Sequence, residues 1–284
     1  MHVQAKPISP LPISLPILGK VNHGRILYGR GTRHIDVRRC AVGSAAFYYG
    51  LRFDISKEFE HLDDDYFLEN SNWFEIKILT NPYRTGDRSN KEPLSDDAYT
   101  KSMKFVLTSL ALPTNKTKHF GRIVGHRMME LNEIHREEIR QLGNWNPNVE
   151  DESYSSKLPM KAIRGAAGFV EADGIYYNPR TNVLVTSKEL LAATPFGCFE
   201  PHYARVLEVS KQAKNKAESK QTALQFLSFM RELNQVFLQD AAAMMIEHPE
   251  RSDHPVFQLP CFKMEQFAVS SRIDLLLLDA RLPT

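Results

Sequence analysis

Apolar residues recur every three or four positions in several parts of the chain, most clearly over residues 222–248. This spacing predicts an α-helix, which Pro249 ends. The apolar positions cover a wide part of the helix circumference, so we expect the helix to be buried in a helical C-terminal subdomain. They are Leu224, Phe226, Leu227, Met230, Leu233, Phe237, Leu238, Ala241, Met244 and Met245.

Shorter segments with the same period predict further helices. A helix from about Val42 would bury Phe47 and Leu51, and Ser95 is a suitable N-cap for a helix over about 98–110. Three more helices are expected within residues 118–169, and a last one over 262–278. The first begins near His119, and the second spans 135–142 and ends before Gly143. The third follows Pro147 and contains Tyr154, and Pro159 interrupts it before 160–169.

The β signals are fewer. Residues 73–79 (WFEIKIL) alternate between apolar and polar positions, which is typical of a short strand. Residues 19–40 predict a β-hairpin with a turn at Gly24 and a strand over 25–28. Residues 1–18 contain four prolines, which exclude a helix or a central strand, and we assign this arm no function. The expected fold class is therefore mostly α with a small β-hairpin or sheet (α+β).

The composition is that of a globular protein, with 42% hydrophobic and 25% charged residues in 284 positions and a net charge of +2. The three cysteines are far apart, which argues against a disulfide framework and favours a reducing compartment. No cysteine–histidine spacing indicates zinc, so we expect no metal site, and we expect no cofactor. No apolar run is long enough to span a membrane. The acidic run over 63–65 is interpreted as a solvated loop.

Residues 20–39 are locally basic and contain a single acidic residue, Asp36. A basic hairpin can hold duplex DNA through its phosphates. The alternative is a solvated edge strand, because charge on an exposed edge opposes aggregation. The interleaved Tyr28 and His34 favour DNA. The candidate DNA-binding residues in this segment are Lys20, Arg25, Arg30, Arg33, His34 and Arg38, with Arg39 in the same cluster.

Three sequence motifs in residues 118–169 are more specific than this basic cluster: HFGR, EEIRQLGNW and SYSSKLPMKAIRGAAGF. They resemble the recombinase-like domain of fungal Crypton-type transposases. They are equally similar to the DNA-binding domain of the large inner-kinetochore subunit that binds fungal point centromeres. The resemblance covers about 19–169 and continues more weakly to the C-terminus. It implies a tyrosine-recombinase catalytic-domain-like fold, followed by the helical C-terminal subdomain.

The resemblance also implies roles for five residues. In a tyrosine recombinase the tyrosine attacks a DNA phosphate, and fixed donors stabilise the negative charge that develops on the phosphate oxygens. Tyr154 would be this nucleophile and Lys20 a general acid on the hairpin. Arg122, His119 and the indole of Trp145 would donate to the phosphate, and an arginine fork can hold two of its oxygens. The alternative for Trp145 and Tyr154 is that they are core aromatics.

A working recombinase needs another arginine before the hairpin lysine, and residues 1–19 contain none. We therefore expect an N-terminally truncated, degenerate scaffold that binds double-stranded DNA mainly through its phosphates, in the nucleus. The alternatives are a fragment of a domesticated Crypton transposase and a protein-interaction module. A homodimer and kinetochore-like or chromatin proteins are the further partners considered, and no membrane is expected. The expected domains are a proline-rich arm (1–18), a recombinase-like DNA-binding domain (19–169) and a helical C-terminal region (170–284).

Overall fold

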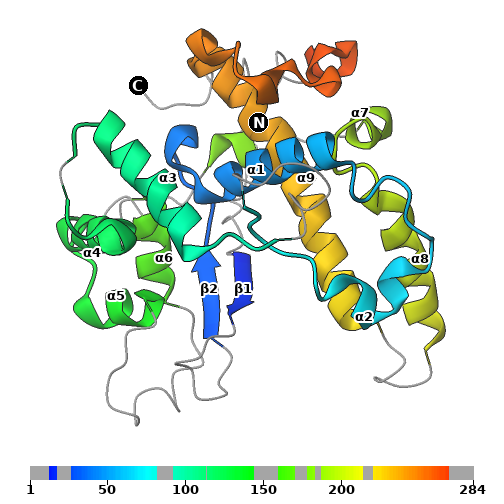
Figure 1. The fold of residues 1–284 in the computed structure, drawn as a ribbon, viewed down its shortest axis with the longest axis horizontal. Helices are drawn as coiled ribbons and strands as arrows, with labels where there is room; N and C mark the ends of the chain where they lie inside the picture. Colours follow the sequence, from blue (N-terminus) through cyan, green and yellow to red (C-terminus); the bar gives the residue numbers. More distant parts are fainter. Residues whose placement is uncertain are drawn as a thin grey trace, which may run out of the picture. The chain divides into compact units, whose positions relative to one another are not determined.

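The computed structural model describes residues 13–17, 27–81, 92–112, 114–143, 159–169, 178–182, 187–213 and 220–268, and these are mostly α-helical (Figure 1). The chain divides into two compact units, each made of two separate segments. Unit 1 contains 1–42 and 114–182, and unit 2 contains 43–113 and 183–284. The units cut across the division into 19–169 and 170–284, which stays a prediction.

Unit 1 contains an antiparallel pair of strands, β1 (Ile13–Ile17) and β2 (Leu27–Gly31), in which Ile13 is opposite Gly31. The hairpin expected over residues 19–40 is matched only in part: β2 overlaps the strand predicted over 25–28, whereas β1 lies in the arm to which no strand was assigned. Pro16 fits in β1 because both strands of a two-stranded sheet are edges, where a missing backbone donor is tolerated. The predicted turn at Gly24 lies outside the described residues.

The helices of unit 1 agree closely with the sequence pattern. The predicted starts near His119, 135 and 160 are confirmed by α4, α5 and α6, whereas the helix expected through Tyr154 lies outside the described residues. The helical segments are η2 (Val37–Arg39), η4 (Thr117–His119), α4 (Phe120–Leu131), α5 (Arg136–Gly143), α6 (Met160–Ala166) and η6 (Pro179–Asn182).

The described residues of two of the three motifs, EEIRQLGNW and SYSSKLPMKAIRGAAGF, contribute to the packing of α4, α5 and α6. Ile139 and Ala162 are buried in one cluster with Met129 and Ile134. The Glu138 carboxylate on α5 accepts a hydrogen bond from the Ala162 amide (3.0 Å), which satisfies an amide in the first turn of α6. A Cβ added at Gly165 would approach the Ile134 side chain to 2.9 Å, so a larger residue there would require Ile134 to shift. These residues of the two motifs therefore form contacts between helices.

Unit 2 is built around α9 (Gln221–Glu247), whose predicted extent and burial are confirmed. A side chain at almost every position from Leu233 to Met244 is buried, as the wide apolar pattern predicted. The other helical segments are α1 (Ala41–Ser56, whose first two residues belong to unit 1), η3 (Tyr66–Leu68), α2 (Asn70–Trp73), α3 (Asp96–Ser109), α7 (Lys188–Ala192), α8 (Phe199–Gln212), η7 (Pro249–Arg251), η8 (Pro255–Gln258) and η9 (Pro260–Lys263).

Two local predictions in unit 2 have mixed outcomes. Ser95 caps α3 as expected, because its side chain accepts from the Ala98 amide. Helix α1 exists, but Phe47 and Leu51 are only partly buried, whereas Phe53 on the same helix is 5% exposed. Gly50 lies against the Phe237 ring, which a Cβ would approach to 2.7 Å. The face of α1 that is buried is therefore the one that packs against α9.

The strand predicted over 73–79 is wrong. Helix α2 ends at Trp73, and no strand follows in the described residues 74–81. The carbonyl oxygens of Lys77 and Ile78 instead accept hydrogen bonds from the Arg52 guanidinium of α1, at 2.6 and 3.3 Å. Only an isolated bridge joins Thr80 to Pro93 in this region. Alternation indicated a strand here, but the carbonyl oxygens of Lys77 and Ile78 have a side chain as their partner, and Leu79 is the residue that bonds to another backbone segment, through the Leu94 amide (2.8 Å).

The remaining features concern the C-terminal end and composition. Of the helix expected over 262–278, residues 265–268 form one helical turn, and the part from 269 onward lies outside the described residues. All three cysteines are free thiols. Among the helices that the structure describes, none has the length and apolarity needed to cross a membrane.

Candidate functional site

His119 and Arg122 lie together at the start of α4. His119 is the N-cap residue, and Arg122 lies in the first turn, near the positive end of the helix dipole. The preceding turn η4 already bonds two amides here, since His119 donates to the Lys116 carbonyl oxygen and Phe120 to that of Thr117. Both side chains are exposed, and neither forms an ion pair within the described residues. The histidine–arginine spacing thus places a guanidinium and an imidazole, two side chains that can donate hydrogen bonds, at one helix end open to an anion.

The surroundings of this helix start are also positively charged. Residues 114–129 contain Lys116, Lys118 and Arg127 but no acidic residue. All three are exposed, and the first acidic side chain along α4 is Glu130, which pairs with His126 at 3.4 Å. An anion at the N-terminal end of α4 would meet no opposing carboxylate on this segment.

The hairpin candidates have different environments. Arg30 lies in β2 opposite Ser14, and its side chain is outside the described residues. Arg33 and His34 are buried, at 8% and 9% exposure, and so have little surface for a ligand. Lys20, Arg25, Trp145 and Tyr154 lie outside the described residues, so their predicted roles are untested.

Arg38 is exposed but already binds a carboxylate. Its Nε and Nη2 donate to the two oxygens of Asp36 at 3.0 and 2.8 Å, and its amide donates to Asp36 at 2.9 Å. The Arg38 guanidinium lowers the pKa of Asp36 to about 2, with help from the Arg38 amide. A phosphate would have to compete with Asp36 for this guanidinium.

His34 is held in a turn that the sequence analysis did not predict. Its Nδ1 accepts from the Asp36 amide at 2.9 Å, while Asn178 and Arg180 donate to its carbonyl oxygen. Neither Asn178 nor Arg180 was named as a candidate. The Asn-Pro-Arg sequence indicated only a loop, and nothing local shows that these polar side chains are 0% and 6% exposed.

We expect the stability of unit 1 to fall with acidification because of His34. Burial lowers the pKa of His34 below 6.5, Arg39 and Arg180 act in the same direction, and Asp36 opposes them. The unfolded chain therefore takes up the proton first. The stabilisation from neutral His34 is full above about pH 6.5 and is lost as the pH falls from there through the lower folded-state pKa. Urea unfolding from pH 7 to pH 5 should show a smaller loss for His34→Asn than for the parent, and equal losses would contradict this role.

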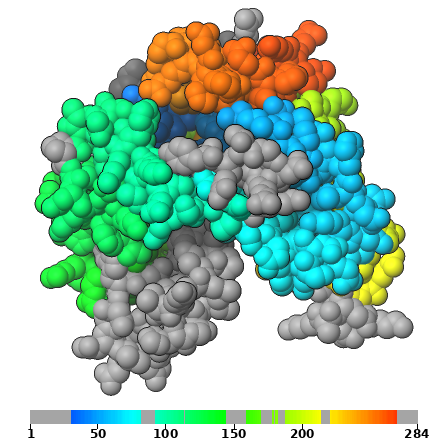
Figure 2. Space-filling model, in the orientation of Figure 1, coloured from blue at the N-terminus to red at the C-terminus, as the bar shows by residue number. Residues whose placement is uncertain are grey.

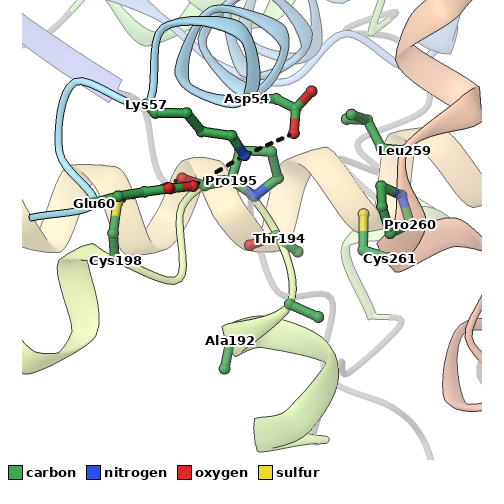
Figure 3. Close-up of a pocket in the computed structure, with 11 residues that line it drawn as sticks. Asp54, Lys57, Glu60, Ala192, Thr194, Pro195, Cys198, Leu259, Pro260 and Cys261 are labelled. Carbon is green, nitrogen blue, oxygen red and sulfur yellow. Dashed lines mark hydrogen bonds and ion pairs between the residues drawn. The ribbon is translucent and has the colours of Figure 1, made fainter.

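Unit 2 contains a cavity of about 290 Å³ (Figure 3). Lys57 lies between Asp54 and Glu60 on its wall, with Nζ 3.3 and 2.9 Å from the two carboxylates. Burial raises the pKa of Cys198 and of Cys261 to about 12, so both thiols are protonated at neutral pH and are weak nucleophiles. No cluster of three metal-ligating side chains occurs in the described part of the chain.

The fold and the cationic helix start together define a mostly α-helical protein with a surface suited to an anionic partner. Residues 19–268 match the family described as the centromere DNA-binding protein complex CBF3 subunit, domain 2, and the chain belongs to this family. The resemblance to the centromere-binding subunit is thus confirmed, and the match continues well beyond residue 169. No curated protein and no solved structure matched the chain.

Proposed function

We propose that this chain binds duplex DNA in the nucleus, mainly through phosphates, on a degenerate tyrosine-recombinase scaffold. Family membership carries the proposal, because the family is described as a subunit of a complex that binds centromere DNA. The exposed side chains of Arg122 and His119 at the start of α4 support it. Chromatin and kinetochore-like proteins are the partners that this function implies.

The proposed contacts are phosphate contacts because of the chemistry of the exposed residues. Arginine holds two phosphate oxygens in a planar fork and keeps its charge at any physiological pH. A helix start adds backbone amides and the positive end of the helix dipole. Such contacts set the position of the protein on the duplex but do not select a sequence.

We choose the residues proposed to contact DNA by their exposure and their charge. His119 and Arg122 remain candidates by exposure, and Lys116 and Lys118 beside them join the proposal. Lys20, Arg25 and Arg30 remain candidates by their charge and their place in or near the strand pair. Arg33 and His34 are left out because they are buried, and Arg38 because it binds Asp36.

Arg122→Ala is expected to weaken binding to an unrelated duplex about tenfold, the cost of one charged hydrogen-bonded contact. The magnitude of the log–log salt slope should fall by about 0.9. The thermal transition should hardly change, because the side chain is exposed. Fluorescence anisotropy over a salt series measures both binding quantities.

The matched control is Arg136→Ala, which removes the same charge from the exposed first residue of α5. It should leave affinity and slope close to those of the parent. If Arg122→Ala instead unfolds the protein with no separable binding defect, Arg122 is structural and the proposed contact is withdrawn.

We expect this polypeptide to form no covalent adduct with DNA through Tyr154. A tyrosine hydroxyl with a pKa near 10 is protonated at neutral pH and needs a site that activates it. A nicked duplex that traps phosphotyrosine, followed by denaturing electrophoresis, tests this. An adduct that disappears in Tyr154→Phe would favour the transposase-fragment hypothesis.

A protein-interaction module is the second candidate, and the exposed apolar side chains of α4 favour it. Ile123, Val124 and Met128 are 37–42% exposed and Leu131 is 82% exposed, and α4 lies at the molecular surface (Figure 2). Apolar surface of this kind often marks a protein contact. Association in light scattering that Leu131→Glu abolishes, together with no salt-sensitive DNA binding, would support this function over the first.

A further inference from the structure

Two buried side chains of unit 1 hold the backbone just after β2. Arg180 donates from Nη1 to the carbonyl oxygen of Ile35 at 2.6 Å and from Nη2 to that of His34. Asn178 donates from Nδ2 to the same His34 oxygen at 3.2 Å. Asn178 is 0% exposed and Arg180 is 6% exposed, so neither side chain offers its donors to a ligand.

The end of α6 holds the same turn from a second direction. The Ile35 amide donates to the carbonyl oxygen of Ala167 at 2.9 Å. Gly168, with φ of +82°, lies so close to the His34 ring that a Cβ there would approach its Cε1 to 2.8 Å. Both backbone groups of Ile35 are therefore bonded, one to α6 and one to Arg180.

This arrangement has a consequence for the strand pair. Strand β2 ends at Gly31, and only Thr32 and Arg33 separate it from the bonded turn. A planar guanidinium that donates to two successive carbonyl oxygens fixes their direction as well as their position. The direction in which β2 leaves the helical part of unit 1 is then set by this turn.

We propose that Asn178 and Arg180 are positioning residues that hold the basic hairpin in its DNA-binding orientation. This inference rests on the proposed function, since the hairpin contributes Lys20, Arg25 and Arg30 to it. The two residues do not contact DNA. They lower the cost of binding because the direction of the chain at the end of β2 is fixed before the duplex arrives.

The alternative is that the two side chains only stabilise unit 1. If the two side chains only stabilise unit 1, their substitution lowers the fraction of folded protein to the same degree whether or not the hairpin contains its basic residues. A positioning role acts through the hairpin residues alone, so its effect must disappear when those residues are removed. A double-mutant cycle separates the two roles.

The experiment compares Arg180→Lys in two backgrounds, the parent hairpin and Lys20→Ala/Arg25→Ala/Arg30→Ala. Lysine keeps the charge but lacks the fork that bonds two carbonyl oxygens. In the parent background, affinity for an unrelated duplex should fall about tenfold, the equivalent of one charged contact. The magnitude of the salt slope should fall by about 0.9, for the equivalent of one lost phosphate contact. In the triple-alanine background neither quantity should change.

Equal losses in the two backgrounds, or no loss in the parent background, would overturn the positioning role. If the parent binds DNA but the triple-alanine protein binds equally well, the hairpin is not a contact, and the inference falls while the proposed function stands on α4. If the parent does not bind duplex DNA, the proposed function itself fails. Should Arg180→Lys not fold, Asn178→Ala replaces it, because it removes a single donor to the same His34 oxygen.

Hydrogen–deuterium exchange of the peptide covering residues 27–36 gives an independent readout. It should be faster in Arg180→Lys than in the parent, because the bonded turn opens more often. Arg52→Lys is the matched control, since Arg52 is also buried and also donates to two successive carbonyl oxygens, but in unit 2. It should leave exchange in residues 27–36 unchanged, and equal acceleration in both variants would contradict a local role for Arg180.

Discussion

Arg52→Met is expected to lower the free energy of unfolding of unit 2 by about 3–5 kcal/mol, the usual cost of removing one partner of a buried ion pair. The Arg52 side chain is 4% exposed, and its Nε lies 2.8 Å from Glu58 Oε1. The angles at this contact fall short of a hydrogen bond, whereas Nη2 does donate to Glu58 Oε2 at 3.1 Å. Without the guanidinium, Glu58 and the carbonyl oxygens of Lys77 and Ile78 lose their partner together.

Urea unfolding followed by circular dichroism measures this loss. Arg205→Met is the matched control, because Arg205 forms an ion pair of similar length with Asp65 (2.7 Å) but the side chains are 40% and 55% exposed. It should cost far less than Arg52→Met, because solvent screens an exposed ion pair. The double variant Arg52→Met/Glu58→Met should regain part of the loss, since no unpaired carboxylate then remains. Equal effects of Arg52→Met and Arg205→Met would show that burial does not determine the strength of the first pair.

The second large effect is expected from the hairpin. Replacement of Lys20, Arg25 and Arg30 by alanine should lower the magnitude of the log–log salt slope by about 2.7, for three lost phosphate contacts. Affinity for duplexes of unrelated sequence should fall by at least about a hundredfold, and by a similar factor for each, because phosphate contacts do not select bases. Anisotropy titrations on two unrelated duplexes over a salt series measure both quantities.

A charge-matched triple variant shows whether the effect belongs to the hairpin. Lys101, Lys104 and Lys263 are exposed residues of unit 2, and their replacement by alanine changes the net charge by the same amount. This variant should bind with nearly the parent salt slope. If both triple variants weaken binding equally, only the net charge of the protein matters, and the hairpin is not a specific contact.

The sequence by itself determined the features that depend on neighbouring residues. The period of apolar positions determined α9, because a helix repeats its face every 3.6 residues whatever its partner. Ser95 marked the start of α3, and the spacing of His119 and Arg122 marked the start of α4, because caps and first turns are built from consecutive residues. The three sequence motifs indicated the family, and the family match confirmed this resemblance.

The tertiary structure decided which polar residues are buried and which segments pair. Arg33 and His34 looked like the other basic residues of their segment, and only the contacts from Asn178 and Arg180 place His34 in a buried turn. Residues 73–79 alternate like a strand, yet Arg52 bonds to their carbonyl oxygens.

The strand β1 shows the physical reason. Its five residues contain Pro16, which argues against a strand until a partner makes it an edge, and that partner is β2, more than ten positions further along the chain. A helix obtains its hydrogen bonds from residues four positions away, whereas strands, buried arginines and bonded turns obtain theirs from residues that the fold brings together. The sequence therefore determined α9 and the starts of α3 and α4, whereas α2, α7 and α8 were not predicted. Only the tertiary structure decided the strand pairing and which basic side chains are exposed.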